Sequence, residues 1–330
     1  MDEQPLDRSL AARIRRRLRR PFSHRRELRL DALEGGIVGG FGQAQAEFGE
    51  IRLRLDEIDH RTRRIEAESE RAAGIARHLY DEEPANRRRL HALRQSEEYE
   101  AAFAEVEPLV SFIVPTYDSH ETLRDVALPS ILGQTYSNLE VLVIGDCAPP
   151  ETAAAIAAVG DPRVVYSNRT IRGPYPRERS KRWYAIGGPP FNEGLARARG
   201  RWIAVLGDDD AVRPTHTERL LAAAREHRWE HCYGYQLVNF VEGEPLRLGR
   251  FPPELGQWGL QAAIYHSGLR FFESELSDAI YEEPSDWSKC RRMLRAGVSF
   301  GMIEEIVVDK NETRRRSAAE WQTGPAPTAD

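Results

Sequence analysis

The sequence predicts an α/β domain, a sheet flanked by helices, that follows a helical N-terminal region. From Val110 to about Val308, short β-branched runs alternate with helical patterns, which is typical of an α/β sheet. Residues 1–107 are instead dense in Ala, Arg, Glu and Leu and hold only two prolines before Pro84, which favours helix. We therefore expect the α/β domain at 108–310 and a disordered tail at 311–330.

Length and composition bound the class of protein. The 330 residues are 41% hydrophobic and 30% charged, enough for one large domain or two ordinary ones. No apolar run approaches the roughly 18–20 residues that cross a bilayer, and the charged N-terminus does not resemble a secretory signal. The three cysteines have no C-x-x-C spacing. We therefore expect a cytoplasmic protein without disulfides or a cysteine-based zinc site.

The charge is unevenly distributed, and its basic part is confined to an N-terminal arm. Residues 1–30 carry a net charge of +6, whereas residues 31–107 carry -7, so nucleic-acid binding is not expected. Leu10, Ile14, Leu18 and Phe22 form one helical stripe beneath the arginines. The arm at 10–22 is therefore either a peripheral membrane contact at the inner face of the membrane or a solvated basic tail.

A heptad pattern follows the arm. Five glycines between residues 35 and 42 predict a flexible break, and a helical region is expected at 43–107. From residue 48 to 79 apolar or small residues recur at alternating spacings of three and four, with charged residues between them. This pattern predicts either a coiled coil that joins subunits into a homo-oligomer or a single amphipathic helix on its own domain.

The α/β region divides into elements in a regular order. Apolar β-branched runs predict strands at 110–114, 139–144, 164–167, 202–206, 233–241 and 303–308. Helical patterns, one of them alanine-rich and another ended by Gly200, predict helices at 121–133, 150–159, 192–199, 215–228 and 287–296. The first half reads as a βαβα nucleotide-binding half-sheet. Ligands of such sheets lie at the carboxyl ends of the strands.

Three consecutive carboxylates directly follow the strand at 202–206. Asp208, Asp209 and Asp210 repel one another unless something neutralises them, and a hard divalent cation bound by carboxylate oxygens does so. The alternative is an acidic surface turn before the next helix. Asp146 and Asp118 follow two other strands and are expected at the same crevice, although Asp118 alone would be an ordinary turn residue.

Asp286 lies where the helix at 287–296 is expected to begin. An acidic residue there is ordinarily a helix cap. It is also a suitable general base for removing a proton from a hydroxyl group. The motif alone leaves both interpretations open.

Four ordered motifs between Val110 and Lys310 resemble the family 2 glycosyltransferases. They are VSFIVPTYDSHETL, SILGQTYSNLEVLVIGD, NEGLARARGRWIAVLGDDDAVRP and SDWSKCRRMLRAG. The second is similar to the family's Q-x-Y-x-N-x-E segment, and the third to its N-x-G-x-x-x-A-x-G segment with the acidic metal-binding run behind it. The resemblance implies the GT-A nucleotide-diphospho-sugar transferase fold, a Rossmann-like mixed sheet flanked by helices.

The resemblance also implies roles for the matching residues. Asp286 would be the general base of an inverting transferase. Asp208 and Asp210 would hold Mn²⁺ or Mg²⁺ on the diphosphate of a UDP- or dTDP-sugar, and Asp209 would lie toward the ribose or sugar. The remaining donor-binding residues implied are Pro115, Thr116, Tyr117, Asp146 and Asn192. The acceptor would be a glycan, a lipid-linked sugar or a small molecule.

An additional segment, Gly173–Pro190, separates the third strand from Asn192. Its Arg177, Arg182 and Trp183 suit phosphates and sugars, so it is either a loop over the pocket or an ordinary surface insertion. A sugar nucleotidyltransferase is the less favoured enzyme, because PTYDSHETLR lacks a G-x-G-x-R loop. A non-catalytic scaffold that oligomerises through 48–79 is the alternative from a different class.

Overall fold

The computed structural model describes residues 24–275, 279, 281 and 283–312, so the basic arm at 10–22 and the tail from 313 lie outside the described residues. The first element is helix α2 (His24–Arg94), followed by α3 (Glu97–Ala104). Ser96 caps α3, because its Oγ accepts the backbone N–H of Tyr99 at 3.2 Å. The chain divides into two compact units, Met1–Glu70 and Arg71–Asp330. Among the described helices, none is long and apolar enough to cross a membrane.

The described strands form one mixed sheet. Its order is β3-β2-β1-β4-β8-β6-β9-β5, with β7 paired to β6. The strands are β1 (Val110–Thr116), β2 (Leu139–Gly145), β3 (Val164–Asn168), β4 (Trp202–Val205), β5 (Ala211–Val212), β6 (His231–Phe240), β7 (Leu246–Leu248), β8 (Ala263–His266) and β9 (Phe300–Glu312). β1 to β4 run parallel to one another, and β8 runs antiparallel to both β4 and β6. The predicted fold class, a mixed α/β sheet behind a helical N-terminal region, is confirmed.

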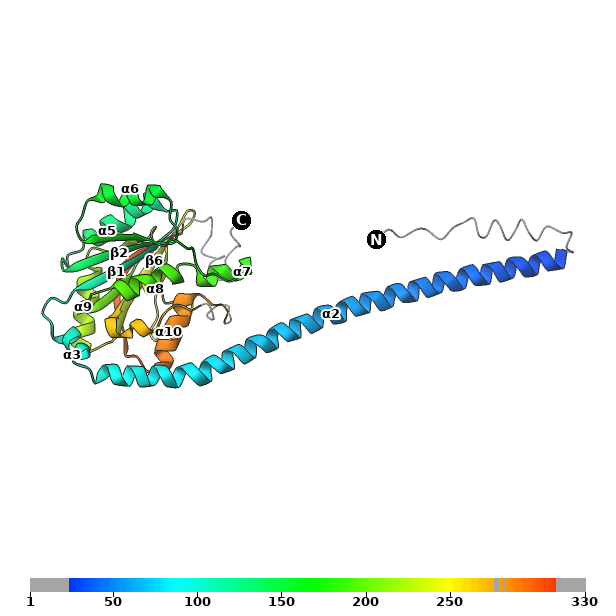
Figure 1. Ribbon diagram of the computed structural model, residues 1–330, viewed down its shortest axis with the longest axis horizontal. Helices are drawn as coiled ribbons and strands as arrows, with labels where there is room; N and C mark the ends of the chain where they lie inside the picture. The colour runs from blue at the N-terminus through cyan, green and yellow to red at the C-terminus, as the bar shows by residue number, and fades with distance from the viewer. Residues whose placement is uncertain (1–23, 276–278, 280, 282, 313–330) are drawn as a thin grey trace. The chain divides into compact units, whose positions relative to one another are not determined.

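Helices cover both faces of this sheet (Figure 1). The described helices that follow α3 are α4 (His120–Thr122), η1 (Leu123–Ala127), α5 (Leu128–Leu132), α6 (Pro150–Val159), α7 (Arg179–Arg182), η2 (Trp183–Ala185), α8 (Gly188–Arg197), α9 (His216–His227), η3 (Leu260–Ala262), η4 (Ser267–Phe271) and α10 (Ser285–Ala296). Because side chains alternate along a strand, β1 contributes to two cores. Phe112 packs in a core with η1, α5 and α9, and Ile113 packs in a core with α8 and α10.

A buried polar cluster ties the starts of β1 and β2 to the turn after α8. Glu140 accepts hydrogen bonds from Ser111 Oγ at 2.6 Å and from the backbone N–H of Arg199 at 2.8 Å. The N–H of Gly200 donates to Ser111 Oγ at 2.8 Å. A Cβ at Gly200 would lie 2.7 Å from the carbonyl oxygen of Leu109, so only glycine fits there. Although burial acts to raise it, the bonds from Ser111 and Arg199 lower the pKa of Glu140.

Three other side chains of the segment before β2 make similar structural bonds. Gln134 Oε1 accepts both the N–H and the hydroxyl of Thr217, each at 3.0 Å. The hydroxyl of Tyr136 donates to the carbonyl of Pro108 at 2.6 Å, and Asn138 Nδ2 donates to the carbonyl of Glu107 at 2.7 Å. These bonds hold the segment against the start of α9 and against the chain that enters β1.

The structure differs from the expectations at two segments. Residues 35–42 were expected to break the helix, but α2 continues through them, although each glycine disfavours helix by about 1 kcal/mol relative to alanine. A Cβ at Gly35 or Gly40 would meet no atom within 4 Å, so no close approach there calls for glycine. At the other end, β9 continues to Glu312, because pairing with β6 extends to that residue. The first two residues of the expected tail are therefore in the sheet.

The α/β domain begins earlier than residue 108. Leu90 of α2 and Phe103 of α3 are buried in its two cores. The indole Nε1 of Trp202 donates to the carbonyl of Ala102 at 3.0 Å. Arg94 makes two hydrogen bonds, of 2.7 and 2.8 Å, to the carboxylate of Glu230, which is fully buried. The end of α2 and all of α3 thus complete the domain.

We expect deletion of residues 1–70 to leave the α/β domain folded and deletion of 1–107 to destabilise it. The longer deletion removes Leu90 and Phe103, whose burial contributes about 1.5–3 kcal/mol each, and leaves Glu230 buried without its guanidinium partner. Thermal unfolding followed by circular dichroism should show a cooperative transition for the shorter deletion only. Equal melting temperatures for the two would contradict this boundary.

Candidate active site

The acidic run Asp208–Asp210 begins three residues after the last residue of β4, Val205, at the carboxyl end of that strand. Gly207 allows two of the carboxylates to approach each other. A Cβ at Gly207 would lie 2.8 Å from Oδ2 of Asp210 and 3.2 Å from Oδ1 of Asp209. These two oxygens therefore face the same small space beside the backbone of Gly207.

Hydrogen bonds hold each part of the acidic run. Oδ2 of Asp208 accepts the hydroxyl of Thr116, at the end of β1, at 2.7 Å. Oδ1 of Asp210 accepts the backbone N–H of Asn311, in β9, at 2.8 Å. The side chain of Asn311 also donates to the carbonyl of Asp209 at 2.8 Å. The ends of β1, β4 and β9 thus meet at these carboxylates.

Burial makes ionisation of this cluster unfavourable. Burial raises the pKa of Asp208 to about 6 and that of Asp210 to about 7, and the neighbouring aspartates add to both increases. The positive charge of Lys310 acts in the opposite direction on Asp210. The cluster is therefore short of positive charge at neutral pH.

The cluster suits a hard divalent cation as a partial set of ligands. Carboxylate oxygens are the ligands that Mg²⁺ and Mn²⁺ prefer, and two of them share the space beside Gly207. In the part of the chain that the structure describes, no group of three or more His, Cys, Asp or Glu side chains could enclose a metal by itself. A cation held here would need oxygen ligands from a substrate.

Asp286 lies in the first turn of α10 and bonds to a backbone N–H of that turn. The residue at the cap position is Pro284, and Oδ1 of Asp286 accepts the N–H of the adjacent Trp287 at 2.8 Å. Burial raises the pKa of Asp286, and the charge of Lys310 and backbone hydrogen bonds oppose that increase. A carboxylate with a raised pKa that faces a cavity has the properties of a general base.

A cavity of about 750 Å³ brings these regions together. Its lining includes Pro115 from β1, Gly207 beside the acidic run, Lys310 from β9 and Asp286 from α10. Aromatic side chains supply part of the remaining wall, as is common in sites that bind sugars and bases; they are Trp183, Tyr184, Phe191, Trp258 and Trp287. Because Lys310 influences the pKa of both Asp210 and Asp286, its charge acts on both acidic groups.

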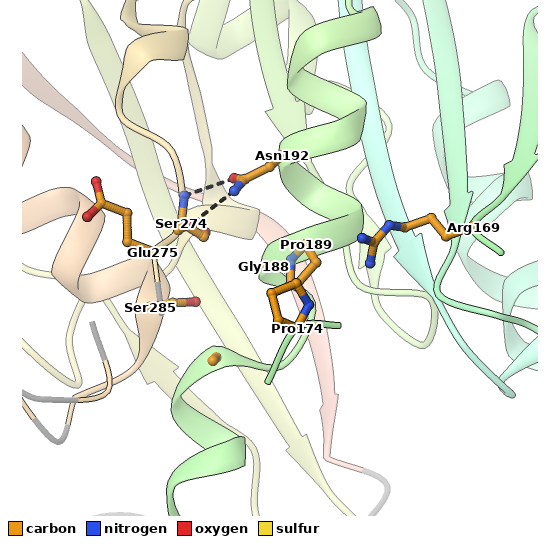
Figure 2. Close-up of a pocket in the computed structure, with 9 residues that line it drawn as sticks. Arg169, Pro174, Gly188, Pro189, Asn192, Ser274, Glu275 and Ser285 are labelled. Atoms are coloured by element: carbon orange, nitrogen blue, oxygen red, sulfur yellow. Dashed lines mark hydrogen bonds between the residues drawn. The ribbon is translucent and has the colours of Figure 1, made fainter. Parts of the chain in front are cut away.

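A smaller cavity of about 250 Å³ shares residues with the larger one (Figure 2). Asn192 of α8 lies on its wall and exchanges two hydrogen bonds with the backbone of Ser274, at 2.8 and 2.9 Å. Arg169 lines the same cavity from the segment after β3. Asn192 is thus at the site, and it also holds the segment around residue 274 in place.

Asp146 holds the loop after β3. Its Oδ1 accepts hydrogen bonds from Arg169 at 2.7 Å and from the N–H of Gly173 at 3.2 Å. Its Oδ2 accepts the hydroxyl of Tyr175 at 2.5 Å and lies 3.7 Å from Arg172. Cζ of Arg172 also lies 3.6 Å from the centroid of the Tyr117 ring. Both carboxylate oxygens of Asp146 therefore accept hydrogen bonds from the protein, and the ring of Tyr117 makes a cation–π contact with Arg172.

The loop residues predicted for the pocket lie in different places. Trp183 lines the larger cavity. Arg182 donates to the carbonyl of Pro176 at 3.2 Å, and Arg177 is exposed. Among the described residues, neither arginine is part of the lining of the two cavities. The sequence did not single out Lys310, although a lone lysine in an apolar strand next to Asp309 was a possible signal.

Comparisons with known proteins identify the family that the α/β region resembles. The family model described as "Glycosyl transferase family 2" matches residues 111–177 and 184–298. The succinoglycan biosynthesis protein ExoO of Rhizobium meliloti is 40% identical over 118 residues, which are 36% of this chain and 30% of ExoO. WfgD of Escherichia coli, named UDP-Glc:alpha-D-GlcNAc-diphosphoundecaprenol beta-1,3-glucosyltransferase, is 29% identical over 133 residues. That match covers 40% of this chain and 47% of WfgD.

The chain therefore spans less than half the length of these two curated relatives. Among solved structures, it aligns with Staphylococcus aureus TarS 1–349 at a TM-score of 0.47 and 17% identity. That alignment covers 61% of this chain and 60% of that one.

We expect Asp210→Asn to stabilise the metal-free protein at pH 8 but not at pH 4. Because the folded-state pKa of Asp210 is raised from 3.8 to about 7, its contribution to stability is complete below pH 4 and is lost as the pH rises through 7. Asparagine stays neutral and keeps an oxygen for the N–H of Asn311. Thermal melts with a chelator should show a gain of several degrees at pH 8, at about 2–4 °C per kcal/mol. The same difference in melting temperature between the variant and the wild type at both pH values would contradict the raised pKa of Asp210.

Proposed function

The chain belongs to glycosyltransferase family 2, and on this premise we propose that it transfers a sugar from a nucleotide-diphospho-sugar to an acceptor hydroxyl, with inversion at the anomeric carbon. The observation that carries the proposal is that Asp286 lines a cavity whose wall also includes Gly207, the residue next to the acidic run. The run Asp208–Asp210 lies at the end of β4, beside Gly207 in the wall. Asp286 enters the same cavity from α10.

The donor diphosphate would bind at the acidic run. Asp208 and Asp210 would hold Mn²⁺ or Mg²⁺ there, and the bound cation would supply the positive charge that stabilises a departing diphosphate. The raised pKa values of both aspartates support this proposal, because the cluster lacks the positive charge that would favour its ionised form. Lys310 contributes one further positive charge to the same cavity.

Asp286 would act as the general base. The acceptor oxygen forms a bond to the anomeric carbon while the bond from that carbon to the diphosphate oxygen breaks. The hydroxyl proton passes to the carboxylate of Asp286, and the nucleoside diphosphate leaves with the bonding electrons. The raised pKa of Asp286 supports this role, because a base works best when its pKa lies near the working pH. Placing base and leaving group on opposite sides of the sugar inverts the anomeric centre.

The donor is proposed to be a UDP- or dTDP-sugar. WfgD, with which this chain shares 29% identity over 133 residues, is named for a UDP-glucose donor and a diphosphoundecaprenol-linked acceptor. By analogy, we propose that the acceptor of this chain is a glycan, a lipid-linked sugar or a small hydroxyl compound. The aromatic walls contributed by Trp258 and Trp287 suit the apolar faces of a sugar ring.

We expect Asp286→Asn to reduce transfer by at least a hundredfold, the lower end of what general-base catalysis contributes, with nucleotide affinity unchanged within a few fold. Asparagine has nearly the same size and cannot accept the proton. Release of nucleoside diphosphate can be followed with purified protein, a nucleotide-sugar panel and an acceptor-sugar panel. Glu283→Gln is a matched control nearby, since Glu283 pairs with Arg291 rather than lining the cavity. Turnover that survives in Asp286→Asn would exclude this base.

We expect a nucleoside diphosphate to raise the melting temperature only when Mn²⁺ is present, because binding to the folded state stabilises it by mass action. Asp210→Ala should remove this Mn²⁺ dependence, whereas Asp161→Ala, which loses an ion pair with Arg163 on the surface, should keep it. An unchanged Mn²⁺ titration in Asp210→Ala would contradict the metal assignment. No shift with any nucleotide would favour the non-catalytic scaffold instead.

A further inference from the structure

The first unit of the chain presents an apolar seam that the described part of its own unit does not cover. It consists of six residues of α2 at spacings of three, four or seven: Phe41, Phe48, Ile51, Leu55, Ile58 and Ile65. Each is between 52% and 71% exposed. Large apolar side chains repeated in this way on one helix are ordinarily buried by another surface.

The seam follows the heptad of a coiled coil. If Phe48 and Leu55 are at position a, then Ile51, Ile58 and Ile65 are at position d, and Phe41 falls at a as well. Alternation of a and d at this spacing over several heptads is the pattern of helices that pair along their length. Thr62, a polar residue at position a, interrupts the apolar pattern without shifting its register.

The charges that flank the seam identify what covers it. In two parallel helices in register, a g residue of one faces the e residue five positions later in the other. The three successive pairs of this kind are Glu47 with Arg52, Arg54 with Asp59, and Arg61 with Glu66. All three join opposite charges. We propose that two copies of this chain form a parallel, in-register coiled coil through the seam at residues 41–65.

The same charges disfavour the antiparallel arrangement. With residues 48–65 overlapped in antiparallel helices, g positions face g positions and e positions face e positions. Arg54 then meets Arg61 and Glu47 meets Glu68, two repulsive pairs, and the one attractive pair is Arg52 with Asp59. Within each helix these side chains already make exposed pairs, such as Arg54 with Glu50 and Arg61 with Glu57. Such pairs contribute little individually, so the contacts across the seam can replace them at small cost.

Substitutions at two neighbouring leucines test the seam. Leu55 lies in it, whereas Leu53, which is 71% exposed, lies at position f on the outer side of the same helix. Light scattering of the full chain should give about twice the chain mass of 37.5 kDa. Leu55→Asp should halve that mass, and Leu53→Asp should leave it unchanged. A monomeric wild-type chain, or equal effects of the two substitutions, would overturn the proposal.

Charge reversals test the pairing and do not alter the apolar seam. Arg54→Glu places like charges against Asp59 of the other copy and should raise the concentration for half-dimerisation at least tenfold. Adding Asp59→Arg should restore it. The matched control is Arg64→Glu, which also loses an exposed pair, with Glu68, but lies at position c. Failure of the double reversal to restore dimerisation would contradict the pairing.

Cross-linking tests the orientation. In a parallel, in-register pair, Ile65→Cys brings the two introduced thiols together at a d position, and mild oxidation should join the copies. In the antiparallel pair, residue 65 lies opposite residue 48, about 26 Å along the helix from its own copy. The wild-type chain, with its three cysteines, and Leu53→Cys are the controls. A dimer in which Ile65→Cys does not cross-link above these controls would exclude the parallel arrangement.

Discussion

The arrangement of the site depends on bringing several carboxylates out of water at one edge of the sheet. Like charges in a poorly solvated place are unfavourable, and the fold limits that cost in specific ways. The hydroxyl of Thr116 bonds to Asp208, and the backbone of Asn311 bonds to Asp210. Lys310 adds a positive charge that acts on both Asp210 and Asp286. The register of β1, β4 and β9 is therefore also what determines the electrostatics of the cavity.

The loop after β3 illustrates the opposite use of a carboxylate. Asp146 is buried and its oxygens are occupied by Arg169, the N–H of Gly173 and the hydroxyl of Tyr175. Fully bonded in this way, it positions neighbouring groups. Asp286 lines the larger cavity and Oδ2 of Asp210 faces the space beside Gly207, whereas Asp146 lines neither cavity. Position at a strand end alone does not separate these two uses; the surroundings of each carboxylate do.

The sequence predicted the elements that depend on local patterns. Apolar runs located β1, β2 and β4, and the acidic residues behind them were correctly expected at the carboxyl ends of the strands, because parallel pairing follows from alternation with helices. Lys310 was not identified, since its position depends on β9 pairing with β6, where its partner Val238 lies 72 residues earlier. The engagement of Asp146 was also missed, because its partners lie in an irregular loop. The break predicted from the glycines at 35–42 was wrong, because helix propensity is only a weak local preference.

The polar cluster around Glu140 belongs to the framework of the sheet and not to the walls of the two cavities. Gln134, Tyr136, Asn138 and Glu140 make up the Q-x-Y-x-N-x-E segment, and each bonds to parts of the framework outside the walls of either cavity. These four residues therefore stabilise the framework of the sheet. A substitution at Asp286, the proposed base, would leave all four of them unchanged. The family segment and the residue proposed to carry the chemistry are therefore separate parts of the sequence.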